Sequence, residues 1–221
     1  MKYQLTAPSY LLPTIAARLA LNAPALQYSL CTPQMGNTSP DLPQLIFQAD
    51  FFHPVRTANT IVDVFVIPSS LATLQGFMLS AGGTQEHLAA VSPILDALAP
   101  IPSGWLHAGE YGSAGFLHQI WNTLVGSHSQ AWLPLWENLQ SPNPSFQINH
   151  PDLVNQLSSF MAQQQLLTQS LASSAQRFLA EYPEHAFTPY HPQQPSLLSR
   201  QAPSKQSPAH EIATLLCSFK I

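Results

Sequence analysis

Two side chains one helical turn apart, His118 and Asn122, give the chain its best combination for acid–base chemistry. An unperturbed histidine titrates near neutral pH, so His118 can act as a base there. The four-residue spacing puts the amide of Asn122 on the same helix face, where it can hold a polar ligand. The pair also fits a structural role, in which hydrogen bonds satisfy both side chains at a domain interface.

The other histidines, cysteines and serines form no pattern typical of a metal site or a hydrolase. His118 and His128 point about 280° apart around a helix, so their side chains diverge. The sequence has no HExxH motif, and we expect no metal ion. Cys31 and Cys217 have no adjacent cation or histidine to activate a thiol. Ser80 lacks the flanking glycines of a GxSxG nucleophile elbow.

Lysine and glycine are distributed unevenly, and both distributions restrict the chemistry. The three lysines, Lys2, Lys205 and Lys220, lie near the two ends of the chain, so none is available as a base in the core. Eight of the nine glycines lie between Gly76 and Gly126. The first part of the chain therefore has no glycine-rich loop, the element that usually cradles dinucleotide phosphates.

Composition excludes several kinds of partner. Only 8% of the residues are charged and the formal net charge is -4, so a basic surface for nucleic acid is not expected. No apolar run approaches 18 residues and no signal-like segment opens the chain, so we expect a cytoplasmic protein with no membrane partner. Two cysteines among 221 residues suit a reducing compartment. Abundant apolar residues with few charges favour a homodimer.

The first half of the chain alternates strand-like and helix-like segments, which predicts a parallel α/β sheet. The strongest strand candidate, 61–67, is a run of β-branched and aromatic residues typical of a strand buried on both faces. Thr84 is expected to cap the helix that follows it. The expected strands are 1–7, 26–31, 44–48, 61–67 and 76–80, and the expected helices are 13–21 and 84–98.

From about Gly112 the apolar spacing becomes helical. The expected helices are 113–140, 151–185 and 209–219. Pro134 is expected to kink the first of these or to start a new helix. The proline-rich stretch 186–208 predicts an extended arm that wraps a partner subunit.

The segment GWLHAGEYGSAGFLHQIWNTL, Gly104 to Leu124, carries the most specific motif. It resembles the start of the long interdomain helix of 6-phosphogluconate dehydrogenases and related β-hydroxyacid dehydrogenases. Matching positions are Gly104, Leu106, His107, Gly109, Gly112, Gly115 and Asn122. The upstream segments AGGTQEHLAAVSPILDALAP and VDVFVIP and the first 22 residues are similar to the family as well. The resemblance implies a shortened Rossmann-like parallel-sheet domain, 1–109, followed by an all-α helical domain, 110–221.

The chain departs from the family pattern where the family binds its dinucleotide. The three glycines of the family's phosphate-binding turn fall on Thr6, Pro8 and Leu11, and Pro8 also lacks an amide donor. Few residues separate Pro68 from the next expected strand, which implies that one βα unit is missing. We therefore expect no bound cofactor.

The family's catalytic positions have changed too. The catalytic lysine falls on His118, its neighbouring histidine on Trp121, and the general-acid glutamate of the phosphogluconate branch on Val125. Only Asn122 keeps the family's residue type. Together with the phosphate-binding turn, the lysine and the glutamate make three separate parts of the hydride-transfer machinery that are lost, which favours a pseudoenzyme.

The resemblance also implies a cleft between the two domains, in which a small anionic ligand would meet His118 and Asn122. Its expected walls are Pro68, Gly82, Gly83, Gly112 and Gly115. We expect a degenerate dehydrogenase-like protein retained as a small-ligand or protein-binding module. The alternative is a diverged oxidoreductase that uses NAD or NADP, with His118 as base and Asn122 holding a hydroxy acid.

Overall fold

The computed structural model describes two compact units. The described residues are 2–33, 41–49, 60–140, 151–183, 185–192 and 206–218, with side chains described outside 127–140, 151–154 and 156–157. The first unit is made of Met1–His118 and Tyr182–Glu211, and the second of Gln119–Glu181 and Ile212–Ile221. The segment Tyr182–Glu211, assigned above to the helical domain, therefore belongs to the first unit.

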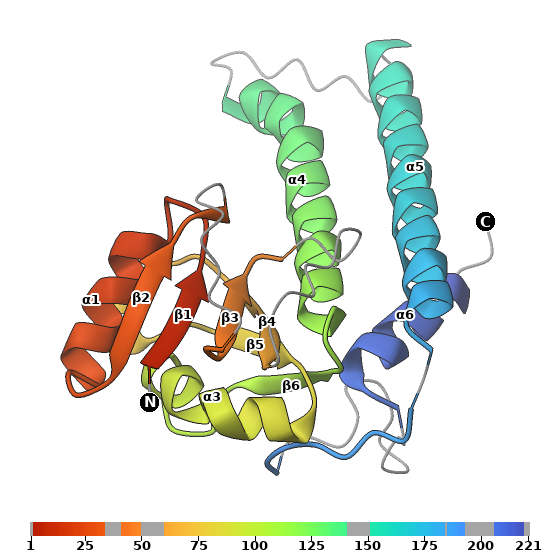
Figure 1. The fold of residues 1–221 in the computed structure, drawn as a ribbon. Coiled ribbons are helices and arrows are strands. Elements are labelled where there is room, and N and C mark those ends of the chain that lie inside the picture. Colours follow the sequence, from red (N-terminus) through yellow and green to blue (C-terminus); the bar gives the residue numbers. More distant parts are fainter. Residues whose placement is uncertain are drawn as a thin grey trace. The chain divides into compact units, whose positions relative to one another are not determined.

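Six strands form one sheet in the first unit, in the order β2-β1-β3-β4-β5-β6 (Figure 1). The first four in chain order are β1 (Lys2–Thr6), β2 (Gln27–Cys31), β3 (Gln44–Phe47) and β4 (Ile61–Val66), and all of them run parallel. Every residue of β4 is buried, as its continuous apolar pattern predicts. The predicted mainly parallel sheet is therefore confirmed.

The last two strands reverse the direction of the sheet. Strand β5 (Leu79–Gly82) pairs antiparallel with β4, and β6 (Leu106–Gly109) pairs parallel with β5. The predicted strand 76–80 begins too early, because Gly76 has φ +86° and its N–H closes the short helix α2 (Ala72–Gln75). Neither α2 (Ala72–Gln75) nor β6 (Leu106–Gly109) was predicted.

Helices α1 (Leu12–Asn22), α2 and α3 (Gln85–Leu98) pack together beside the sheet (Figure 1). Thr84 caps α3 as predicted, because its Oγ1 accepts the backbone N–H of His87 at 3.3 Å. Apolar side chains of the strands and of α1 and α3 form one continuous core, which includes Leu5, Ile15, Leu19, Leu45, Val64, Leu88, Ile94 and Leu95.

The second unit is helical. It holds α4 (Ser113–Gln140) from Gln119 onward, α5 (Pro151–Glu181) and the last part of α6 (Pro208–Ser218). Helix α4 continues across Pro134, so no new helix starts there. The predicted class, an α/β part plus an all-α part, is confirmed. None of the described helices combines the length and apolarity that crossing a bilayer requires.

A buried arginine ties the helices of the first unit together. Arg18 of α1 is 6% exposed, and its guanidinium donates to three backbone carbonyl oxygens. These belong to Leu74 at 2.8 Å, Ala97 at 3.1 Å and Ala99 at 2.7 Å. Two of these carbonyls lie at the carboxyl end of α3, where the helix dipole favours a cation.

Replacing Arg18 by methionine, which has similar length but no donors, should destabilise the fold. Three carbonyl oxygens, two of them in buried hydrogen bonds, would lose their partners, so we expect the free energy of unfolding to fall by about 3 kcal/mol in urea denaturation. The matched control is Arg177→Met, which removes an exposed pair with Glu181 at 2.7 Å and should cost less than about 0.5 kcal/mol. Equal losses in the two variants would contradict this account of Arg18.

Candidate functional site

The connection from β1 to α1 is where the resemblance puts the phosphate-binding glycines. Thr6 ends β1, and Leu11 is only 3% exposed because its side chain lies in the core. The N–H of Ala7 donates to the carbonyl of Cys31 at 3.0 Å, and the N–H of Leu11 donates to Pro8 at 2.9 Å. Pro8 has no N–H. The amides of Ala7 and Leu11 thus form hydrogen bonds within the protein, so they do not point at a ligand.

The sheet has its topological switch point between β1 and β3, where α/β proteins commonly bind ligands. Gln48 follows β3 there in a left-handed conformation, with φ 56°. Its Nε2 donates to the carbonyl of Val66 at 2.8 Å. Its Oε1 is buried and has no hydrogen-bond partner within the described ranges. Sequence reasoning missed Gln48, although a polar residue directly after a buried strand is a usable signal.

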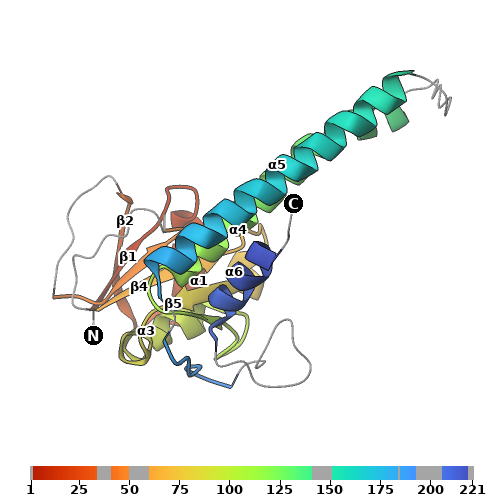
Figure 2. The same cartoon turned by 90° about the vertical axis from the view of Figure 1, so that its right-hand side faces the viewer.

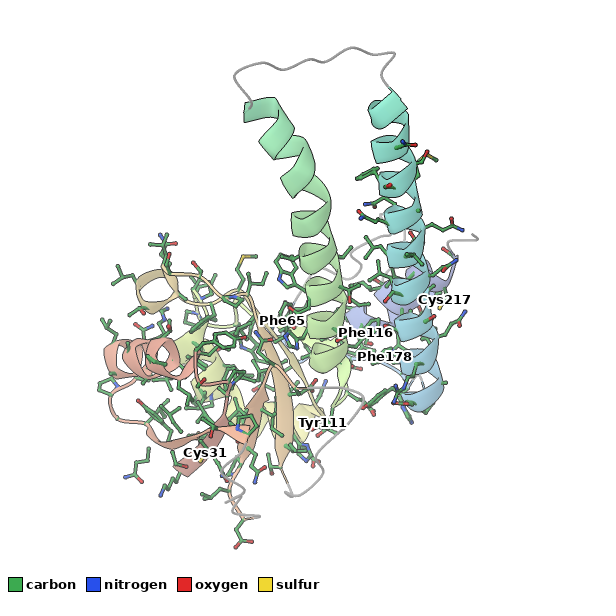
Figure 3. All side chains as sticks on the ribbon, turned by 90° about the horizontal axis from the view of Figure 1, so that it is seen from above. Cys31, Phe65, Tyr111, Phe116, Phe178 and Cys217 are labelled. Carbon is green, nitrogen blue, oxygen red and sulfur yellow. The ribbon has the colours of Figure 1, made fainter. Side chains whose placement is uncertain are left out.

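His118 lies in the first unit, half-buried on α4. Its ring centroid is 5.7 Å from that of Phe65, which is labelled in Figure 3 and stands next to the end of β4. Asn122 follows one turn later, is exposed and belongs to the second unit. Trp121 and Val125 are exposed as well. The predicted spacing on one helix is present, while the roles of His118 and Asn122 stay a prediction.

The structure separates Pro68 from the other four residues expected to form the cleft wall. Pro68 follows the end of β4, whereas Gly82 pairs with a residue near its beginning, because β5 is antiparallel. Gly83 directly follows Gly82. Gly112 and Gly115 stand at the start of α4, on the same edge as Gly82. The expectation of a single cleft assumed a sheet without this reversal.

Asp63, which sequence reasoning missed, joins β4 to the first turn of α4. Its Oδ1 accepts the N–H of Gly112 at 3.0 Å, and its Oδ2 accepts the N–H of Gly115 at 2.7 Å. Burial raises the pKa of Asp63 to about 7, although these backbone hydrogen bonds favour the carboxylate. Gly82 leaves room for the carboxyl group, because a Cβ there would collide with Oδ1.

A cavity of about 320 Å³ opens at this edge of the first unit. Its walls are the ends of β5 and β6, the first residues of α3, α4 and α6, and the segment 182–188. This segment and its continuation pass the start of α3 (blue in Figures 1 and 2), where Gln85 Nε2 donates to the carbonyl of Thr188 at 3.1 Å. The polar side chains in the wall include His107, Glu110, Ser113, Tyr182, His185, Ser207 and His210.

His107 is a structural member of this wall. Its Nδ1 accepts the N–H of Tyr190 at 3.1 Å, so Nε2 carries the ring hydrogen. That N–H donates to the carbonyls of Gly83 and Gly109, each at 3.1 Å. Burial lowers the pKa of His107, and the two carbonyls counteract this only in part. Both ring nitrogens are engaged, so His107 holds the segment that contains Tyr190 against β6.

A second histidine pairs with a serine across the cavity wall. Ser207, just before α6, places its Oγ 2.9 Å from His210 Nδ1. His210 Nε2 is 2.8 Å from the carbonyl oxygen of Tyr182. Near them His185 Nδ1 lies 3.7 Å from Glu110 Oε1, and both of these side chains are more than 60% exposed. Sequence reasoning missed the Ser207–His210 pair, although the pattern S-x-x-H before an apolar helix marks it.

Comparison with known proteins gives similarities of fold only. No protein-family model matches the chain, and no curated protein matches it. Among solved structures, an imine reductase variant from Myxococcus stipitatus in complex with NAD+ is 11% identical with a TM-score of 0.40, over 85% of this chain and 79% of that one. An imine reductase from Pseudomonas sp. is 10% identical with a TM-score of 0.43, over 83% and 78%.

A third solved structure is 3-hydroxyisobutyrate dehydrogenase from Mycobacterium tuberculosis with L-serine. It is 10% identical with a TM-score of 0.40, over 59% of this chain and 62% of that one.

The raised pKa of Asp63 predicts a pH-dependent stability. An unfolded aspartate titrates at 3.8 and the folded one at about 7, so between these values only the folded state keeps the proton. Stability therefore falls as the pH rises, by up to about 1.4 kcal/mol per unit relative to Asp63→Asn. Urea denaturation of both proteins at pH 5, 6 and 7 measures this. If the unfolding free energy of the wild type minus that of Asp63→Asn stayed constant or rose with pH, the prediction would be wrong.

Proposed function

We propose that this chain is a small-ligand-binding module on a Rossmann-like sheet, which does not bind a dinucleotide and has lost dehydrogenase chemistry. The observation that carries the proposal is the β1–α1 connection. The side chain of Leu11 is buried there, and its N–H donates to the carbonyl of Pro8. Pyrophosphate binding needs a close approach to backbone amides at the start of a helix. Pro8 removes one such amide.

The strand order supports the same proposal. In the described part of the chain only the four-residue helix α2 separates β4 from β5, and β5 reverses direction. The continuous parallel part of the sheet therefore has four strands. Only β1 and β2 lie on one side of the switch point, and β3 and β4 lie on the other. A sheet this narrow gives an extended dinucleotide fewer strand ends to lie across than a six-stranded parallel sheet does.

The second candidate is an oxidoreductase with NAD or NADP that uses His118 as base and Asn122 to hold a hydroxy acid. The observation that favours it is the placement of His118, half-buried at the edge where β4 ends. Hydride transfer requires a cofactor held against the substrate, so this candidate depends on dinucleotide binding.

Calorimetry with NADH and NADPH separates the two candidates. We expect no saturable heat up to about 1 mM of either, since the amides of Ala7 and Leu11 are bonded within the chain and Pro8 has no N–H. A thermal-shift panel of small carboxylates and phosphates then searches for the proposed anionic ligand. A micromolar dissociation constant for NADPH, with turnover abolished in His118→Ala, would establish the oxidoreductase instead.

We also propose a homodimer through the helical half of the chain, in a cytoplasmic setting. Its support is a set of five large apolar side chains exposed on the described helices of the second unit, namely Trp121, Val125, Met161, Leu166 and Leu215. Side chains of this kind on a sparsely charged protein are typical of an interface.

Light scattering at micromolar concentration should give about twice the 24.2 kDa mass of the chain. The variants Met161→Asp and Leu166→Asp should shift the protein toward the monomer, because a charge in the interface core is costly. Leu74→Asp, at an equally exposed position of the first unit, is the control and should stay dimeric. A monomeric wild-type protein would rule this assembly out.

A further inference from the structure

The hydrogen bond between Ser207 and His210 runs in the direction that a nucleophile and its general base require, from the hydroxyl to the ring nitrogen. Both side chains are buried, at 4% and 8% exposure. The carbonyl oxygen of Tyr182 can only accept, so His210 Nε2, 2.8 Å away, must carry the ring hydrogen. Nδ1 then presents its lone pair to Ser207 Oγ at 2.9 Å. A serine whose hydrogen bonds to a base oriented by a third group is the arrangement of nucleophilic catalysis.

Ser113 places a second hydroxyl at the same point of the cavity. It is 2% exposed and it lines the cavity. A Cβ on Gly109 would lie 2.6 Å from Ser113 Oγ and 2.8 Å from Ser207 Oγ. The missing side chain of Gly109, at φ +140°, therefore gives the two hydroxyls a shared space.

We propose that Ser207, His210 and Ser113 form an esterase site for small, uncharged acyl esters. This goes beyond the proposed binding function and uses neither His118 nor Asn122. Ser207 Oγ bonds to the acyl carbon while its proton passes to His210 Nδ1. Ser113 Oγ–H donates to the carbonyl oxygen as negative charge develops on it. The C–O bond to the alcohol breaks, and His210 returns the proton to the leaving oxygen.

The second half of the reaction restores the site. Water, deprotonated by His210 Nδ1, attacks the acyl carbon, the bond to Ser207 Oγ breaks, and that oxygen takes the proton back. The sum is ester plus water giving carboxylic acid plus alcohol, with no further reactant. The carbonyl of Tyr182 is a positioning group, because it fixes the histidine tautomer and does not touch the substrate.

The cavity lining sets the substrate class. Pro183, Ala186 and Phe187 give it an apolar side, and its lining includes no lysine or arginine among the described residues. Glu110 and His185 are exposed and pair with each other, so they add no net positive charge when both are ionised. A volume of about 320 Å³ is at the lower end for ligand sites. These features suit a short apolar acyl group and disfavour a phosphorylated substrate.

Ser207 also has a structural task that the test must keep intact. As the residue before α6, its Oγ accepts the N–H of His210 at 3.3 Å. Loss of such a cap costs about 1 kcal/mol. Asparagine caps a helix as well as serine does but is no nucleophile, so Ser207→Asn removes the chemistry alone.

The probes are p-nitrophenyl acetate for turnover and a small fluorophosphonate for covalent labelling of the full chain. We expect a single adduct on Ser207 and a measurable hydrolysis rate. Ser207→Asn should lose both, and His210→Asn should lower turnover about 100-fold. Ser113→Ala should lower turnover about 100-fold with a smaller effect on KM, since its hydrogen bond forms in the transition state. Ser80→Ala, an equally buried serine outside the cavity lining, should be unchanged.

The variant Ser207→Cys, whose side chain is close in size to that of serine, allows thiol reactivity to be compared within one protein. His210 should generate its thiolate, so iodoacetamide at pH 7 should modify Cys at this position at least about tenfold faster than Cys31 or Cys217. No adduct on wild-type Ser207, turnover that persists in folded Ser207→Asn or His210→Asn, or equal alkylation rates would overturn the proposal. NADPH calorimetry is independent of all these readouts, so the two proposals fail separately.

Discussion

A buried carboxyl group, that of Asp63, joins the central strand β4 to helix α4, and the geometry at this edge of the sheet depends on that link. It binds the amides of Gly112 and Gly115, groups that no helix can satisfy internally. Fixing the first turn of α4 also fixes Gly109 and Ser113 just before and within it. The cavity wall is therefore an indirect product of one side chain on β4.

Arg18 is a second buried ionisable side chain whose hydrogen-bond partners are main-chain groups. It places a cation among carbonyl oxygens, as Asp63 places a carboxyl group among amides. In a chain with only 8% charged residues, both buried groups are thus compensated by the main chain. Backbone N–H and C=O groups point in fixed directions. Asp63 therefore positions the start of α4 and Arg18 the end of α3, while the main chain stabilises both side chains.

Sequence patterns predicted the elements whose signals are local. The buried strand at 61–67 and the Thr84 cap depend on neighbouring residues, and both were found. The reversal at β5 was not predictable, because strand direction depends on pairing between distant segments. The candidate site was predictable in part for the same reason. Replacement of the phosphate-binding glycines can be read directly, whereas the pairing of His210 with Tyr182 spans 28 positions and leaves no periodic trace.

The first unit is discontinuous along the chain, since Tyr182–Glu211 returns to it after the long helical excursion Gln119–Glu181. His107 and Gln85 hold that returning segment by hydrogen bonds to Tyr190 and Thr188. Closing a loop costs free energy that grows only logarithmically with loop length, by about 0.6 kcal/mol per doubling. The number of residues between the two parts of the first unit therefore adds little to the entropic cost of bringing the returning segment back to the sheet. Evolution of the helical part is thereby uncoupled from preservation of the α/β part.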